Sequence, residues 1–342
     1  MIPLPEWSWF LGFWFGTVIG SFLNVVIYRV PRGLSLSKPA NSFCPKCKHP
    51  LKTADLVPLV SYLVLGRKCR YCHEPVSARY FAVEFLTGVV WAGIWWQYLL
   101  VQQEPAKMLA YAAAASCLIA IIFIDWELYI IPDQINAVLW LIGMLYSGWL
   151  IYQNSPGAWT WGMPSGVAGW IVGVGLIWGI AFLGLVAFRK DAMGHGDIKM
   201  ARGIGAVLFP ALTVMSVGLA VVVGAVLGVV QILLRGKPTE PEGNESEEEG
   251  EEMPPETIGS LVRCGLGYLL LIDVIGLLFP KVYKAWFGED PYAIEEDLET
   301  FEVERTMIPF GPYLALGAII AAVFHGPIFE WFEAYQQWAG MR

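Results

Sequence analysis

The chain has 342 residues, of which 56% are hydrophobic and only 15% charged, and its mean hydropathy is +0.54. This composition excludes an ordinary soluble globular protein and is typical of a polytopic membrane protein. The formal net charge of -8 comes from two acidic stretches, 239–256 and 289–304, which hold 9 and 8 carboxylates and no Lys or Arg. The acidic balance is therefore local, and we expect no nucleic-acid partner.

The first apolar run, residues 7–30, is expected to be a retained transmembrane helix, because it lacks the basic start and small-residue cleavage site of a signal peptide. Gly20, Ser21 and Asn24 lie at helical spacing in this run. Small and polar residues at such spacing allow close helix packing in membranes, so this face should pack against other helices.

Residues 31–79 form a polar segment, and the stretch from Arg29 to Arg79 holds ten of the 22 basic residues. The positive-inside rule places this segment in the cytoplasm. It contains two CxxC pairs, separated by residues 48–68: Cys44 with Cys47, and Cys69 with Cys72. Such pairs predict a small zinc-ribbon-like module with one tetrahedral Zn²⁺. Disulfides are the alternative, which a reducing cytoplasm disfavours, and the adjoining His49 and His73 are alternative ligands.

The rest of the chain contains further apolar runs, and we expect an all-α membrane protein with about eight transmembrane helices. The runs are 81–101, 108–124, 132–152, 167–188, 198–234 and one ending near Phe324. The run 198–234 is longer than one span and contains Pro210, which favours a short helix, a kink and a longer helix. The tail after Phe324 is expected outside.

Two aspartates lie where apolar runs begin or end. Asp125 follows Ile121–Ile124, and Asp197 lies in the sequence Gly194-His195-Gly196-Asp197-Ile198-Lys199. Ionisable groups near a membrane boundary are costly and are candidates for function. Glycines 194 and 196 allow a tight turn and a close approach of another segment. Two such carboxylates could share one proton and activate a water, although an ordinary loop carboxylate is the alternative for Asp197.

Two more charged residues are candidate supporting groups. Asp133 lies at the start of the 132–152 run, where we expect it to cap or orient that helix. Lys199 could bind substrate, but we interpret it as a marker of the cytoplasmic side.

Residues 235–306 form an insertion that joins the acidic stretches through an apolar segment, 258–279. Arg263 and Asp273 lie inside that segment, and a charge at mid-bilayer costs roughly 2.5–3.5 kcal/mol on insertion scales. We therefore expect the segment to lie along the interface or to dip in and return, with both acidic stretches in the cytoplasm. The competing layout makes 198–234 one outward span and 258–279 a returning span.

Five motifs, in order, resemble the prepilin peptidase family of type IV prepilin leader peptidases and N-methyltransferases. They are Gly20-Ser21-Phe22-Leu23-Asn24, the CxxC pairs, Ile124-Asp125 to Ile131-Pro132-Asp133, the GxGD motif at 194–197, and Pro309-Phe310-Gly311-Pro312. The insertion 235–306 departs from the short loop that the family would lead us to expect.

The resemblance implies an aspartic endopeptidase of the GxGD type in the bacterial cytoplasmic (inner) membrane, with Asp125 and Asp197 as the catalytic pair. It implies prepilin or type II secretion pseudopilin substrates and methylation of the new N-terminus with S-adenosylmethionine. No glycine-rich nucleotide loop locates that cofactor. The implied domains are a first helix (7–30), the module (31–79), a peptidase core (80–234), the insertion (235–306), and a last helix with its tail (307–342).

Two rival functions remain open from the sequence. A proton-coupled transporter with a zinc-ribbon regulatory module would also use paired intramembrane aspartates. A methyltransferase alone, with structural aspartates, is opposed only by the family resemblance.

Overall fold

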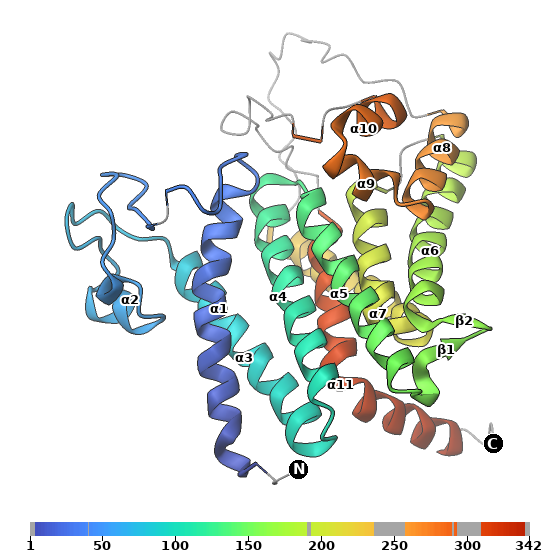
Figure 1. Cartoon of the computed structure of the whole chain (residues 1–342), viewed down its shortest axis with the longest axis horizontal. Helices are drawn as coiled ribbons and strands as arrows, with labels where there is room; N and C mark the ends of the chain where they lie inside the picture. Colours follow the sequence, from blue (N-terminus) through green and yellow to red (C-terminus); the bar gives the residue numbers. More distant parts are fainter. Residues whose placement is uncertain are drawn as a thin grey trace.

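The computed structural model describes residues 4–39, 41–189, 193–235, 257–288, 291–292 and 309–338. It is mostly helical (Figure 1). The α-helices are α1 (Trp9–Arg29), α2 (Val60–Val64), α3 (Ala78–Ile94), α4 (Pro105–Leu128), α5 (Asp133–Tyr152), α6 (Ser165–Phe188), α7 (His195–Arg235), α8 (Ile258–Leu269), α9 (Ile272–Leu278), α10 (Pro280–Phe287) and α11 (Gly311–Trp338). A π-helix, η3 (Trp95–Val101), continues α3, and short 3₁₀ helices cover η1 (Glu6–Ser8), η2 (Thr53–Asp55) and η4 (Pro156–Ala158).

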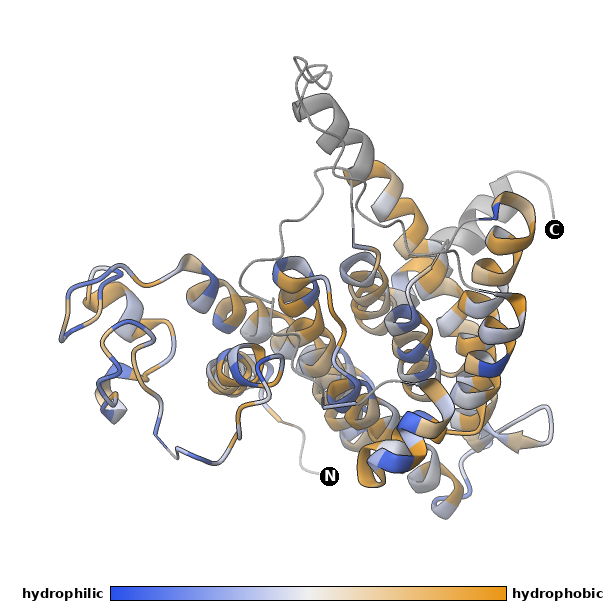
Figure 2. Ribbon diagram, turned by 90° about the horizontal axis from the view of Figure 1, so that it is seen from above, coloured by the Kyte–Doolittle hydropathy of each residue, from blue (hydrophilic) through white to orange (hydrophobic). Residues whose placement is uncertain are grey.

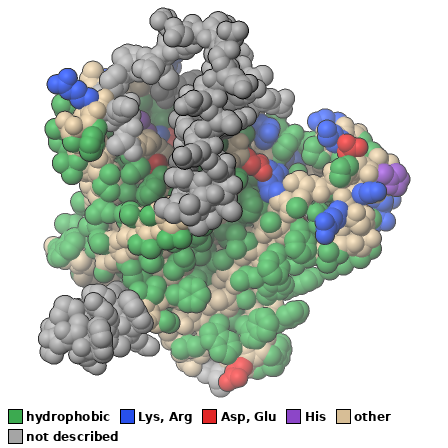
Figure 3. All heavy atoms as spheres, turned by 180° about the vertical axis from the view of Figure 1, so that it is seen from behind, with side chains coloured by type: hydrophobic (Ala, Val, Ile, Leu, Met, Phe, Trp, Pro, Cys, Tyr) green, Lys and Arg blue, Asp and Glu red, His purple; other side chains and the backbone are tan. Residues whose placement is uncertain are grey.

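Five helical segments are long and apolar enough to cross a membrane: η1 with α1, α4, α5, α6 and α7. The count reaches six if α8 and α9, which bend by 70° at their junction, form one span. Residues Gly311–Phe324 of α11 make a shorter apolar helix. The multi-pass prediction is therefore confirmed, while the count of about eight stays a prediction. Figure 3 shows the broad hydrophobic surface, with most of the visible charged side chains near one end.

Helices α1 and α3 pack closely because α1 presents glycines to α3. A Cβ on Gly16 would lie 2.8 Å from the Cα of Gly88, and one on Gly20 would lie 2.7 Å from the Cα of Glu84. The Asn24 Nδ2 also donates to the carbonyl of Tyr80 at 3.1 Å. The prediction that this face of the first helix packs against another helix is confirmed.

Helix α7 contains a reversal of chain direction. Phe209, directly before Pro210, has φ 64° and ψ 172° and interrupts the helical conformation. Before this point α7 packs against α6, where Gly169 and Gly205 are in backbone contact. After it, α7 packs antiparallel to α11, since Gly317 contacts Ser216 and Ala220 while Tyr313 lies near Gly224. The two halves of α7 therefore run down and back up in Figure 1. The break lies at the predicted kink next to Pro210.

The described part of the insertion, α8 to α10, lies at the upper end of the bundle in Figure 1, against α5, α6 and α7. Because α7 returns to that end and α11 starts there, this layout agrees with a segment that lies along the interface or dips in and returns, and not with one long outward span in 198–234. The acidic stretch 239–256 and most of 289–304 lie outside the described residues.

The expected helical fold is confirmed in its main features, with one small hairpin after α5 formed by β1 (Trp159–Thr160) and β2 (Met163–Pro164). The apolar part of the last helix ends at Phe324, near the predicted end of the last span, and the helix itself continues to Trp338. Seen from above in Figure 2, the four-cysteine module protrudes to one side of the apolar bundle.

Candidate active site and four-cysteine centre

Asp125 and Asp197 are carried by two helices that meet at the upper end of the bundle. Asp125 lies in the last turn of α4, and Asp197 lies in the first turn of α7. Their side chains are buried, with 5% and 8% of their residue surfaces exposed, and they interact electrostatically with each other. The Oδ1 atom of Asp197 is buried and has no hydrogen-bond partner among the residues that the structure describes. Two buried carboxylates that interact can share one proton and act as acid and base on a water.

Three glycines lie beside the two aspartates, and at Gly311 and Gly196 other groups occupy the space that a side chain would need. A Cβ on Gly311, at the start of α11, would clash with the Oδ2 of Asp125. A Cβ on Gly196 would lie 3.0 Å from the Cβ of Ile131, and one on Gly194 would lie 3.4 Å from the Oδ2 of Asp197. The site is thus assembled from the end of α4, the turn before α5, and the starts of α7 and α11.

Lys199, which we expected to mark the cytoplasmic side, is buried, with only 7% of its surface exposed. Its Nζ donates to both carboxylate oxygens of Asp133, at 2.7 and 2.8 Å. Asp133 is the first residue of α5, where a negative charge also interacts favourably with the helix dipole. The pair therefore ties the start of α5 to the first turns of α7.

The four cysteines of the two CxxC pairs meet in the module, and all four Sγ atoms lie within 4.8 Å of one another. Sulfurs around a tetrahedral zinc with bonds of about 2.3 Å would lie at similar separations. None of the four forms a disulfide. The cluster is therefore compatible with a single zinc ion bound by Cys44, Cys47, Cys69 and Cys72.

The two halves of this cluster have the same backbone design. Isolated β-bridges flank them, Phe43 with Pro50 and Lys68 with Pro75, and a residue with positive φ follows each pair, Lys48 at 59° and His73 at 58°. Burial of the Cys69 thiol acts to raise its pKa, but hydrogen bonds from the backbone of Cys72 and Tyr71 outweigh this and hold the pKa below its ordinary value. Backbone N–H groups that stabilise a thiolate favour metal binding.

The neighbouring histidines have other contacts or positions. The ring of His49 lies over that of Tyr71, with centroids 3.8 Å apart. His73 is the positive-φ residue of the second pair. The group of potential ligands found among the described residues contains the four cysteines and neither histidine.

Comparison with known proteins identifies two family regions in the chain. Residues 14–98 match the bacterial peptidase A24 N-terminal domain, and residues 112–229 match the type IV leader peptidase family. A prepilin leader peptidase/N-methyltransferase of Myxococcus xanthus is 33% identical over 323 residues, which cover 92% of this chain and 89% of the relative.

This chain belongs to the type IV leader peptidase family. Proteins with the same name from Neisseria gonorrhoeae and Aeromonas hydrophila are 30% and 32% identical, over 65% and 67% of this chain and 82% and 83% of their own lengths. No solved structure matches the chain significantly. The leader peptidase match at 112–229 includes both Asp125 and Asp197.

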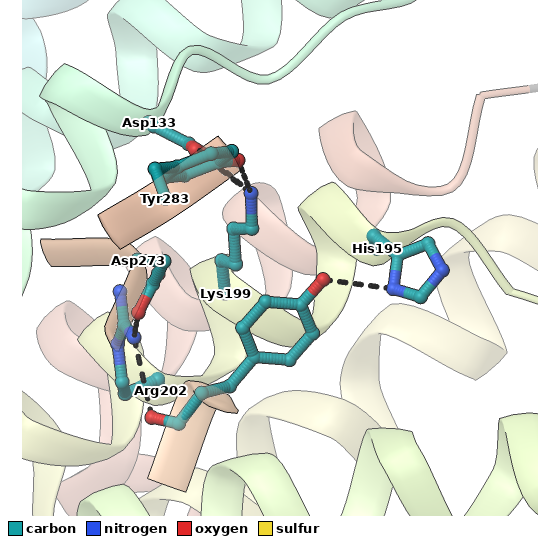
Figure 4. Close-up of polar contacts among 7 residues, drawn as sticks. Asp133, His195, Lys199, Arg202, Asp273 and Tyr283 are labelled. Carbon is teal, nitrogen blue, oxygen red and sulfur yellow. Dashed lines mark hydrogen bonds and ion pairs between the residues drawn. The ribbon is translucent and has the colours of Figure 1, made fainter. Parts of the chain in front are cut away.

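The structure also brings residues to the neighbourhood of the two aspartates that sequence reasoning did not place there. They are Arg202 of α7 and three residues of the insertion: Tyr268, Asp273 and Tyr283 (Figure 4). A signal for one contact was present, because Arg202 and Asp273 are opposite charges in two different apolar runs. Such charges are costly in a membrane unless they pair. For Tyr268 and Tyr283, nothing in the sequence indicated a contact with α7.

Proposed function

We propose that this leader peptidase removes the leader peptide from type IV prepilins or type II secretion pseudopilins, with Asp125 and Asp197 as its catalytic pair. The observation that carries the proposal is the meeting of these two buried, interacting carboxylates inside the region that matches the family. Family membership alone supports a prepilin peptidase. The burial and electrostatic interaction of the two aspartates support the assignment of this pair.

The proposed chemistry is hydrolysis of one peptide bond by an activated water. The ionised carboxylate of the pair accepts a proton from the water, whose oxygen attacks the scissile carbonyl carbon. The protonated carboxyl donates a hydrogen bond to the carbonyl oxygen as negative charge develops there. When the tetrahedral intermediate collapses, the carbon–nitrogen bond breaks and the leaving amine takes a proton from the pair. The leader then carries the new carboxyl end, and the mature pilin carries the new amine.

The site is proposed to face the cytoplasm of a bacterial cytoplasmic membrane. The four-cysteine module, whose segment is rich in basic residues, lies toward the same end of the bundle as the end of α4 and the start of α7, which carry the two aspartates (Figure 1). Positively charged loops favour the cytoplasmic side. A substrate whose leader emerges in the cytoplasm and whose next segment is apolar would reach this end of the bundle from the bilayer.

We also propose a structural Zn²⁺ in the module and N-methylation of the new pilin N-terminus. The four thiols of Cys44, Cys47, Cys69 and Cys72 suit the ion, which would hold together a module with few buried apolar side chains. The relatives' names include N-methyltransferase, which implies S-adenosylmethionine as methyl donor.

The proposed function is tested with purified full-length protein in liposomes and a full-length prepilin. Mass spectrometry of the product should show the loss of the leader and, with S-adenosylmethionine present, the addition of one methyl group at the new N-terminus. An intact substrate would reject the peptidase. A cleaved but unmethylated product would reject only the methyltransferase.

A further inference from the structure

Helices α8 to α10 of the insertion (257–288), which we call the cap, contact the start of α7 on both sides of Asp197. The Tyr268 hydroxyl lies 2.8 Å from the Nδ1 of His195, two residues before Asp197. The Tyr283 hydroxyl accepts from the Nζ of Lys199, two residues after it, at 3.0 Å. Figure 4 shows the hydrogen bonds made by Lys199 and by His195, with Tyr283 beside the Lys199 ammonium group. The GxGD motif therefore starts a helix whose first turns are held by the insertion.

The contact at Lys199 joins three helices in a closed arrangement. Lys199 donates to both oxygens of Asp133, and Tyr283 donates to the Oδ2 of Asp133 at 2.8 Å. The rings of Tyr268, Tyr283 and Phe287 lie 5.4, 5.5 and 5.9 Å from the Nζ. A buried ammonium group is stabilised by a carboxylate and by aromatic faces at these distances. Three of these four neighbouring residues, Tyr268, Tyr283 and Phe287, belong to the cap.

The third contact is a fully buried ion pair. Arg202 donates to the Oδ1 of Asp273 at 2.6 Å, and the side chains are only 1% and 2% exposed. Arg202 also donates to the carbonyl of Tyr268 at 3.3 Å. Removal of one partner from such a pair leaves a buried charge without compensation, which is strongly destabilising. The stable packing of the cap and that of the second turn of α7 therefore depend on each other.

These contacts bear on catalysis because the position of Asp197 is set by its helix. Its Oδ1 has no partner within the described part of the chain, so no described side chain bonded to that oxygen fixes it against Asp125. A displacement of about 1 Å in a catalytic group can cost about 100-fold in rate. A small rotation of the first turns of α7 would move the carboxylate by such an amount.

We infer that the cap is a positioning element of the peptidase: Tyr268, Asp273 and Tyr283 fix the first two turns of α7 and thereby hold Asp197 in place against Asp125. This inference rests on the proposed function of the pair. It gives the insertion a role in the reaction, although none of its described residues is assigned to the chemistry.

The test uses full-length protein in liposomes and three variants. Tyr283→Phe removes one hydroxyl and keeps the ring, so the protein should fold. Asp273→Asn removes the charge opposite Arg202. Arg263→Gln is the control, because Arg263 bonds the carbonyl of Ala285 at 2.7 Å inside the cap and has no contact with α7 among its described interactions.

Two quantities separate positioning from simple support of the fold. For Tyr283→Phe we expect kcat for prepilin cleavage to fall about tenfold, the cost of a hydrogen bond to a charged group, with KM changed less than about twofold. Asp273→Asn should lower kcat further. In both variants, amide hydrogen exchange in residues 195–202 should become faster. Arg263→Gln should leave both quantities at the wild-type values.

Wild-type kcat and unchanged exchange in Tyr283→Phe and Asp273→Asn would overturn the inference. An equal fall of kcat in Arg263→Gln with unchanged exchange in residues 195–202 would also overturn it, because the loss of activity would then not depend on the contacts between the cap and α7. If the wild-type protein cleaves no prepilin, the proposed function fails, and the exchange of residues 195–202 still decides whether the cap holds α7.

Discussion

Gly311 lies so close to Asp125 that a Cβ at position 311 would overlap the Oδ2 of the aspartate. The two residues come from α11 and α4, which are distant in the sequence. The same Cβ would lie 2.9 Å from the Cδ1 of Ile131. The backbone of α11 is therefore one wall of the aspartate site, and it can approach only because residue 311 has no side chain.

This relationship predicts that Gly311→Ala inactivates the peptidase. The added methyl must displace Asp125 or move α11, and either change separates the two carboxylates. We expect cleavage of a prepilin in liposomes to fall at least about 100-fold, as for a displaced catalytic group. The control is Gly148→Ala in α5, where a Cβ meets nothing within 4 Å, and it should cleave at the wild-type rate. Equal activity of both variants would contradict the packing at Gly311.

The Lys199–Asp133 pair predicts a measurable loss of stability. Lys199→Met leaves a mostly buried carboxylate without its partner, since the two side chains are 9% and 13% exposed. We expect a loss of about 3 kcal/mol, the lower end for breaking a buried pair. The measurement is denaturant unfolding in detergent micelles.

The double variant Lys199→Met with Asp133→Asn should lose less than the sum of the two single variants, because the second change removes the unpaired charge. Lys281→Met on the exposed side of α10 is the control and should be within about 0.5 kcal/mol of wild type. Additive losses would show that Lys199 and Asp133 do not interact.

The long helices, the break in α7 and the cysteine cluster could be predicted from the sequence, because each depends on the composition or spacing of residues within one segment. Apolar runs located the long helices, Pro210 marked the reversal in α7, and the CxxC spacing brought the four cysteines together. These features depend on composition and local spacing. A helix in a membrane must satisfy its own backbone hydrogen bonds, so its presence can be predicted without knowledge of its neighbours.

The partners of the charged residues could not be predicted, because they depend on how separate segments pack. In the sequence, Lys199 looks like an ordinary lysine at the end of an apolar run. Only the packing of α5 and the cap shows that it binds Asp133 and Tyr283. From the sequence alone, the charge of Asp273 would make insertion of a spanning helix costly. In the fold, Arg202 forms an ion pair with Asp273 and compensates that charge. The closeness of Gly311 to Asp125 likewise depends on the packing of α11, although the family resemblance pointed to that motif.

The four-cysteine cluster predicts about one zinc per chain. Elemental analysis of purified protein should find the ion in wild type and lose it in Cys44→Ser and in Cys69→Ser, since each removes one of four thiolate ligands. Cys117→Ser in α4, outside the cluster, should retain it. Unchanged zinc in both cluster variants would contradict this ligand set.

The position of the cap predicts its side of the membrane. A cysteine in place of exposed Lys281, in a background without other reactive cysteines, should be protected from an impermeant maleimide in intact spheroplasts and labelled after lysis. A cysteine at Trp159, which is 56% exposed in the β-hairpin at the opposite end of the bundle, should be labelled without lysis. The reverse pattern would invert the orientation proposed for the whole bundle.

The central claim is that Asp125 and Asp197 together perform the cleavage, and the most direct measurement is the activity of Asp125→Asn and Asp197→Asn. Asn keeps the size of the side chain but cannot act as a carboxylate base or as a carboxylic acid. Both purified variants should accumulate in the membrane, retain zinc and leave a prepilin uncut. Near-normal cleavage by either variant would contradict the aspartate pair as the catalytic site of this leader peptidase.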